Sequence, residues 1–159
     1  ANRVLPDYFN GGEYKPKASL ATLANAMDVG APSNFERLRW LYRGNDAALR
    51  DAFTSQAVDD ASIRQTIAHR HGEYDEVFCP HTATAVHVLE QLRASGSAAS
   101  DQHWAVAATA HPAKFESVVE PLIGREVEVP PALAELLKRP AHAEPCAPDY
   151  AVLREKLLR

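Results

Sequence analysis

The stretch WAVAATAHPAKF at residues 104–115 decides the fold. Its first half, residues 104–109, is too short for a helix and lacks polar alternation, which predicts a short strand buried on both faces. Pro112 suits the first position of a helix, where its missing N–H is not needed. Apolar residues then recur at helical spacing as far as Gly124, which is a typical helix end. This stretch therefore predicts a strand–turn–helix unit of an α/β fold.

The end of the predicted strand is also where a ligand site is expected. In open α/β sheets, ligands bind at the carboxyl ends of strands, beside the N-termini of helices. Thr109 and His111 would lie there, although a threonine at a strand end often satisfies only its own backbone. We interpret His111 as a cap of the following helix. We expect Lys114, about one turn into that helix, to be solvated.

The pattern divides the chain into three segments with different expected structure. Residues 1–32 carry repeated Asn, Gly and Pro turn signals and are predicted to be mainly loop. Residues 33–95 are predicted to be helical, and residues 103–159 to contain the strand–helix unit and C-terminal helices. Residues 126–129 are a second, brief strand candidate. The whole chain has the length of one domain or a large piece of one.

Several expected helix ends follow from capping signals. Ser33 and Glu36 have the spacing of a capping box, in which each side chain accepts the other's backbone N–H. Asp59 is expected to precede a helix that ends at Gly72, and Asp149 to cap the last helix.

Composition excludes some classes of function. The net charge is −4 and 46% of residues are hydrophobic, so neither nucleic acid nor an anionic membrane is an expected partner. No apolar run has the length of a membrane span. Cys79 and Cys146 are far apart and predict free thiols in a reducing cytoplasm. A zinc site at Cys79, His81 and His87 is rejected because the spacing matches no closed zinc pattern, and we predict no metal.

Four stretches together resemble one enzyme family. They are TAHPAKF at 109–115, ATLANAMDVGAPSNFERL at 21–38, PHTA at 80–83 and APDYAVLR at 147–154. In this order they are similar to passages of threonine synthase, a pyridoxal-phosphate enzyme of the tryptophan-synthase-β-like fold (fold type II). The resemblance implies an α/β fold of which this chain is the C-terminal part, helix-rich and with few strands.

The resemblance also implies an activity. Threonine synthase is a lyase of threonine biosynthesis that converts O-phospho-L-homoserine and water to L-threonine and phosphate. The family carries its Schiff-base lysine and its cofactor-phosphate loop in an N-terminal part. The lysines here, at positions 15, 17, 114, 138 and 156, lie in no such context. We therefore expect pyridoxal phosphate to be bound mainly by the N-terminal part of the same enzyme. We expect no catalytic residue in this chain, and no catalysis by the chain alone.

Five residues are candidates for contact with a ligand. The resemblance implies a hydrogen bond from the Thr109 hydroxyl to the pyridine nitrogen of the cofactor, and it places His81 and Thr82 beside the cofactor ring. A helix cap by Thr82 is an equally good explanation of that residue. Asp28 and Asn34, in the longest matching stretch, are the candidate substrate contacts. Because Asp28 would repel a phosphate, we expect it to orient its neighbours or to meet an ammonium group.

Two other functions remain open. The parent enzyme could be a threonine-synthase-like phospho-lyase that releases a keto acid. The chain could instead be a non-catalytic interaction module derived from the enzyme. If the chain is a fragment of the enzyme, the strand at 104–109 lacks some of its neighbours, and its uncovered edge predicts self-association of the isolated chain.

Overall fold

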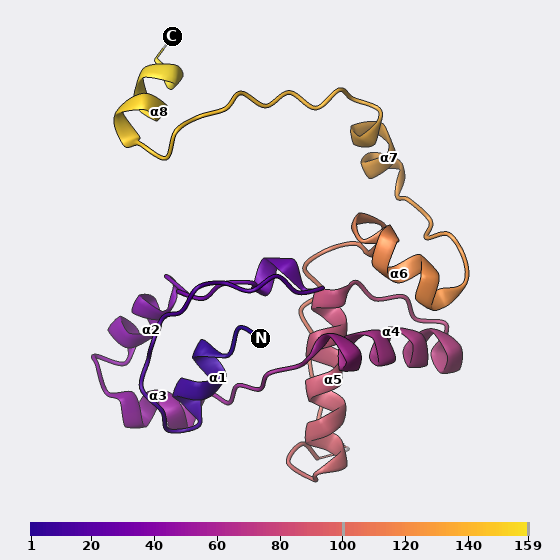
Figure 1. The fold of residues 1–159 in the computed structure, drawn as a ribbon. Helices are drawn as coiled ribbons and strands as arrows, with labels where there is room; N and C mark the ends of the chain where they lie inside the picture. Colours follow the sequence, from indigo (N-terminus) through magenta and orange to yellow (C-terminus); the bar gives the residue numbers. More distant parts are fainter. Residues whose placement is uncertain (100, 159) are drawn as a thin grey trace. The chain divides into compact units, whose positions relative to one another are not determined.

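The computed structural model describes residues 1–99 and 101–158, and every regular element in that part of the chain is a helix. Contacts divide the chain into two compact units, Ala1–Val127 and a second unit that starts at Glu128. The elements, shown in Figure 1, are α1 (Val4–Phe9), η1 (Asn25–Met27), α2 (Phe35–Leu41), α3 (Asp46–Ala52), α4 (Asp60–Tyr74), α5 (Pro80–Ala94), η2 (Pro112–Lys114), α6 (Glu116–Ile123), α7 (Pro131–Leu137) and α8 (Tyr150–Leu157).

One core of the first unit is aromatic and joins α1, α2 and α3. Tyr8, Phe35 and Leu49 are buried at its centre, and the Tyr8 and Phe35 rings meet edge to face with centroids 4.7 Å apart. Arg50 of α3 lies over the Tyr8 ring at 4.5 Å. The Arg50 guanidinium also donates to the carbonyl oxygens of Tyr8 (3.1 Å) and Gly12 (3.0 Å). This cluster orders the start of the chain, where sequence predicted mainly loop.

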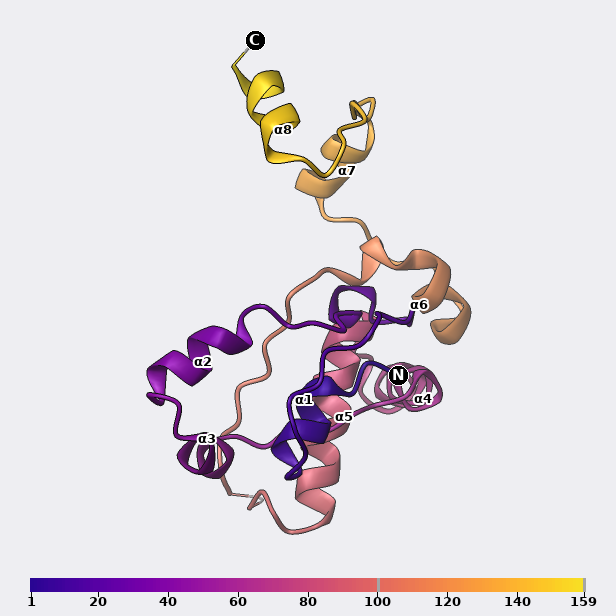
Figure 2. The same cartoon turned by 60° about the vertical axis from the view of Figure 1, so that its left-hand side comes forward.

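The other core of the first unit is formed by longer helices. Helix α4 packs against both α5 and α6, and Figures 1 and 2 show α4 crossing beside α5. The apolar residues Ile63 and Ile67, one turn apart, are 2% and 0% exposed. Asp59 caps this helix as expected, because its carboxylate accepts the N–H of Ser62 at 2.7 Å. The N-terminus of α5, where the candidate site lies, is therefore supported by a well-packed pair of helices.

Two predicted helix ends are wrong. The Ser33–Glu36 capping box does not form, since α2 starts at Phe35 and no side chain caps it. The Glu36 N–H lies 3.3 Å from the backbone oxygen of Ser33, so a backbone turn takes the place of the side-chain cap. Gly72 lies inside α4, which continues to Tyr74 and ends at Asp75 in the left-handed conformation (φ 52°). An internal glycine costs a helix only about 1 kcal/mol, which the packing of α4 offsets.

Two other helix ends are confirmed. Gly124 ends α6 with φ 70°, a conformation that a glycine adopts without strain. Asp149 caps α8 by accepting the N–H of Ala151 at 2.7 Å and that of Val152 at 3.2 Å.

Both strand predictions are wrong for the described residues. The segment 104–109 is irregular, Thr109 is exposed, and the Trp104 side chain is 46% exposed. Near the second candidate, the Val127 N–H donates to the carboxylate of Glu120 at 3.1 Å. A buried strand needs neighbouring strands to accept and donate its backbone hydrogen bonds. The described part of this chain contains no such neighbour, so the apolar run stays an unpaired segment.

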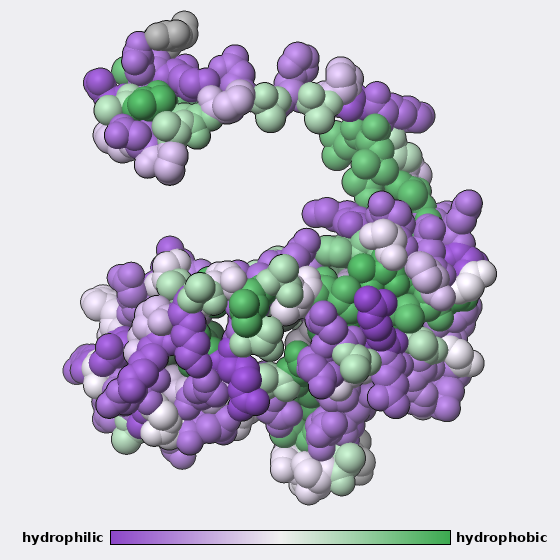
Figure 3. Space-filling model, in the orientation of Figure 1, coloured by the Kyte–Doolittle hydropathy of each residue, from purple (hydrophilic) through white to green (hydrophobic). Residues whose placement is uncertain are grey.

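The second unit consists of two short helices with exposed apolar side chains. Leu136 and Leu137 of α7 are 56% and 66% exposed, and Figure 3 shows hydrophobic surface along this helix. Lys156 of α8 pairs with Glu144 at 2.9 Å. Neither helix has a buried residue, so this unit forms no hydrophobic core of its own. Across residues 1–99 and 101–158, no helix is both long and apolar enough to cross a membrane.

Candidate functional site

His81 is the centre of the candidate site. It is the second residue of α5 and only 4% of its surface is exposed. Its Nε2 accepts the N–H of Ala26 at 3.0 Å, and its ring lies 5.0 Å from the Phe115 ring, centroid to centroid. One imidazole thus joins the η1 segment, the start of α5 and the chain that follows η2. These are three of the four stretches that the sequence singles out.

The hydrogen bond from Ala26 determines which nitrogen of the His81 ring carries the proton. A nitrogen that accepts a hydrogen bond carries no proton, so a neutral ring has its proton on Nδ1. This Nδ1 is buried and has no hydrogen-bond partner among the described residues. Burial lowers the pKa of His81 below its ordinary value, the Asp28 carboxylate opposes that change, and Lys114 adds to it. His81 is therefore a neutral hydrogen-bond donor at neutral pH.

The lowered pKa of His81 makes stability depend on pH. The unfolded chain binds this proton below about pH 6.5, the ordinary value for histidine, whereas the folded chain does so only at lower pH. The stabilising contribution of neutral His81 is thus complete above that value and is lost as the pH falls toward the folded pKa. We expect the free energy of unfolding in urea to fall more steeply below pH 6.5 for the wild type than for His81→Gln. Parallel pH profiles of the two proteins would contradict this.

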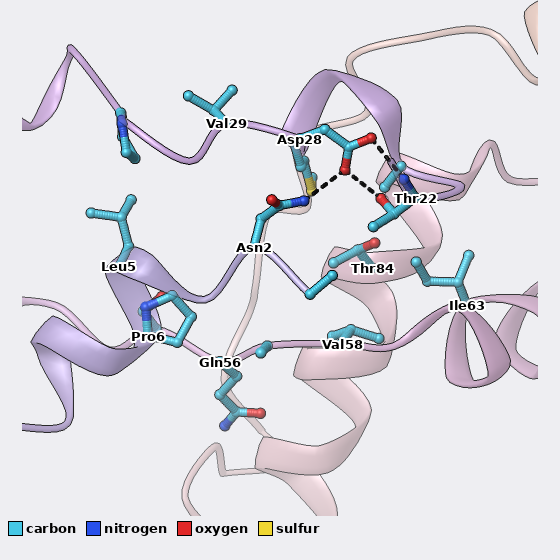
Figure 4. A pocket seen from close by; sticks show the side chains of 16 residues that line it. Asn2, Leu5, Pro6, Thr22, Asp28, Val29, Gln56, Val58, Ile63 and Thr84 are labelled. Carbon is cyan, nitrogen blue, oxygen red and sulfur yellow. Dashed lines mark hydrogen bonds between the residues drawn. The ribbon is translucent and has the colours of Figure 1, made fainter. Parts of the chain in front are cut away.

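Asp28 forms side-chain hydrogen bonds next to η1, the segment whose Ala26 amide donates to His81. Its Oδ1 accepts from Asn2 Nδ2 (2.9 Å) and from Thr22 Oγ1 (2.6 Å), and its Oδ2 accepts the Thr22 N–H (2.8 Å), as Figure 4 shows. Asp28 also lines a cavity of about 330 Å³ together with Leu5, Met27 and other residues. The expectation that Asp28 orients its neighbours is confirmed. Its contact with a substrate stays a prediction.

The loop that carries Asp28 is also held by a close approach between the backbones of Gly30 and Lys17. The Lys17 N–H donates to the Gly30 carbonyl oxygen at 2.9 Å, and the Gly30 N–H donates to Ser19 Oγ at 3.0 Å. A Cβ added at Gly30 would overlap the carbonyl oxygen of Lys17. Only glycine permits this approach, and it holds Asp28 two residues away in place.

The segment that ends at Thr109 lies along α5. Val106 and Ala108 line a second cavity, of about 260 Å³, with Thr82 and Val86 of α5. Thr109 follows directly, is exposed, and its hydroxyl makes no hydrogen bond within the described residues. The structure thus brings the segment of Thr109 to the helix that carries His81.

The neighbours of these residues have structural roles. His111 caps η2 as expected, since its Nδ1 accepts the Ala113 N–H at 3.2 Å. Lys114 is exposed, as expected. Thr82 is buried with its Oγ1 3.3 Å from Cys79 Sγ. Because α5 starts at Pro80, before Thr82, the alternative that Thr82 caps this helix is wrong.

Asn34 lies apart from the other predicted residues. It is exposed, precedes α2, and makes no capping hydrogen bond with its side chain. No contact described for the chain joins it to Asp28 or His81, so its assignment as a substrate contact stays a prediction. Sequence reasoning missed Asn2 and Thr22, which hold Asp28. Thr22 lies within the matching stretch at 21–38 but was not singled out there, and no local motif marks Asn2.

The histidines and cysteine weighed as zinc ligands have other partners. His87 Nδ1 lies 3.2 Å from Thr66 Oγ1 and its Nε2 3.2 Å from Gln91, while Cys79 contacts Thr82. The described ranges contain no group of three side chains placed to hold a metal ion.

Comparison with known proteins gives a consistent match. The family model described as "Threonine synthase, C-terminal" matches residues 82–156. Threonine synthase of Escherichia coli strain K12 is 33% identical over 99% of this chain and 35% of its own length. The Haemophilus influenzae enzyme is 34% identical over 100% of this chain and 36% of its own. The chain thus spans about a third of the relatives it matches.

Solved structures agree with the sequence matches. The crystal structure of Escherichia coli threonine synthase superimposes with a TM-score of 0.81 at 33% identity, covering 99% of this chain and 35% of that one. A pyridoxal-phosphate-bound threonine synthase from Brucella melitensis gives a TM-score of 0.63 at 26% identity, covering 86% and 34%.

The fold therefore matches the C-terminal portion of a fold-type-II pyridoxal-phosphate enzyme, helix-rich in this part. The chain matches the C-terminal portion of threonine synthases and spans about a third of their length.

Proposed function

We propose that this chain forms one wall of the active site of a threonine synthase that converts O-phospho-L-homoserine and water to L-threonine and phosphate. The observation that carries the proposal is the meeting at His81 of three segments that resemble this family, joined by the Ala26 hydrogen bond and the Phe115 ring contact. The small-molecule substrate and a cytoplasmic location belong to the same proposal. We include no nucleic acid or membrane among the partners.

The residues present fit pyridoxal phosphate as a cofactor. The buried Nδ1–H of His81 is a hydrogen-bond donor without a partner among the described residues, as a ligand-facing group would be. The hydroxyl of Thr109 is likewise free to pair with a ring nitrogen. A neutral hydroxyl at that position would not hold the ring protonated as a carboxylate does. When bound, the cofactor supplies an electron sink for carbanion chemistry. Asp28 and Asn34 are the proposed substrate contacts.

The Schiff-base lysine is proposed to lie in the remainder of the enzyme. Imine-forming lysines are desolvated so that they can lose their proton. Lys114 is exposed, and the other lysines lie in ion pairs at the surface. These pairs are Lys15–Glu13, Lys17–Asp7, Lys138–Glu135 and Lys156–Glu144. We therefore propose that the isolated chain is inactive. The exposed apolar side chains of its second unit would favour self-association.

Phosphate release from O-phospho-L-homoserine tests this function. We expect release by the full-length enzyme supplied with pyridoxal phosphate, and none by the 159-residue chain under the same conditions. Threonine as the other product supports the assignment, whereas a keto acid would identify a phospho-lyase. If neither protein releases phosphate, the substrate assignment is contradicted and a non-catalytic interaction module is favoured. Activity of the short chain alone would show that one of its own lysines forms the imine.

A further inference from the structure

We propose that His81 is a positioning residue, whose Nδ1–H donates a hydrogen bond to an acceptor oxygen of the bound cofactor or substrate while its Nε2 holds the Ala26 amide. This inference rests on the proposed function and deepens it. It assigns His81 a direction of hydrogen bonding, a class of ligand atom, and a link between the ligand and the η1 segment.

The direction of hydrogen bonding follows from the Ala26 contact. An amide N–H is only a donor, so the Nε2 atom 3.0 Å away must be the acceptor. The neutral imidazole then presents a donor on the other side of the ring, at an atom that the described residues leave buried and unpaired. A ligand atom that fills this position must be an acceptor.

The charged groups described near His81 do not supply this acceptor. The two oxygens of Asp28, whose charge acts on His81, already accept from Asn2 and Thr22. Lys114, whose charge acts on His81 less strongly and in the opposite sense, carries only donors. Phosphate, carboxylate and phenolate oxygens are acceptors, and they occur on the cofactor and on a phosphorylated amino acid.

The same ring would transmit ligand binding to the η1 segment. Orienting Nδ1 toward a ligand fixes the imidazole plane, and Nε2 then fixes the Ala26 amide. Asp28 follows two residues later and is tied to Thr22 and Asn2. Ligand binding at Nδ1 should therefore protect the amides of residues 24–28 from exchange with solvent.

The test uses the full-length enzyme with ¹⁵N-labelled histidine, without ligand, with pyridoxal phosphate, and with pyridoxal phosphate plus inorganic phosphate. The His81 signals are assigned by their loss in His81→Gln. We expect a neutral Nδ1–H tautomer throughout, a ligand-induced shift of the Nδ1 resonance, and slower hydrogen exchange in residues 24–28. A shift with the cofactor alone places the acceptor on the cofactor, and a shift only after phosphate addition places it on the substrate phosphate.

Matched variants separate positioning from packing. Glutamine can accept from Ala26 and donate to the ligand, so His81→Gln should bind the affected ligand within about threefold of the wild type. His81→Phe keeps a ring against Phe115 but loses both hydrogen bonds, and should bind about ten- to a hundredfold more weakly.

An Nδ1 resonance that no ligand moves would overturn the inference even if His81→Phe fails to fold. If phosphate is released while this resonance stays unchanged, the proposed function stands and the inference fails. If no cofactor binds at all, both fail.

Discussion

Replacement of Gly30 by alanine is expected to destabilise the protein by about 2–4 kcal/mol. The new Cβ would overlap the Lys17 carbonyl oxygen and lie 2.9 Å from the carbonyl carbon of Ala18. Both atoms are backbone, so neither can rotate away. The loop must open, and the hydrogen bonds that Gly30 makes with Lys17 and Ser19 are lost. Urea unfolding followed by circular dichroism measures the change.

The matched control for this variant is Gly72→Ala. Gly72 lies inside α4, and a Cβ there would meet no atom within 4 Å. Alanine is the better helix former, so we expect this variant to be more stable by up to about 1 kcal/mol. Opposite signs for the two glycine variants show that the close approach at Gly30 is the cause. Equal effects would mean that the contact with Lys17 does not constrain the loop.

Truncation of Ile67 to alanine is expected to cost about 2–5 kcal/mol. The side chain is completely buried in α4, the helix that packs against both α5 and α6. Its removal leaves a cavity that the surrounding helices can only partly close. Since α5 carries His81, we also expect weaker binding of ligands at the site.

Two further variants calibrate the Ile67 result. Ile67→Val removes one methylene and should cost about 0.5–1.5 kcal/mol. Leu157→Ala changes a side chain in α8 that is 76% exposed, and should change the free energy of unfolding by less than about 0.5 kcal/mol. A loss below about 1 kcal/mol for Ile67→Ala would show that the α4 interface is not packed as described.

Helix positions could be predicted from the sequence where the signal is local. The Asp59 and Asp149 caps and the Gly124 helix end need only neighbours within a few residues. Helix α1 escaped prediction because it is short, contains Pro6, and is held by the distant side chain of Arg50. The strand predicted at residues 104–109 is wrong for a different reason. An apolar run indicates side chains that a sheet could bury, but a strand also needs neighbouring strands, which the run does not supply.

The candidate site, like the fold, could be predicted only where the signal is local. Asp28 and His81 could be singled out because they lie in distinctive stretches. Their partners could not, because Ala26 lies 55 residues from His81 and Asn2 lies 26 residues from Asp28. The Nδ1–H of His81 emerges only from the structure, because the partner of Nε2 decides which nitrogen carries the proton.

The two cysteines give the chain a built-in reporter of local opening. Cys79 has no exposed surface and precedes α5, directly before the turn that carries His81, whereas Cys146 is exposed in the second unit. A thiol reagent meets Cys146 in the folded state but reaches Cys79 only when the N-terminus of α5 separates from its neighbours. The slower labelling rate therefore measures how often the wall of the site opens, without any added probe.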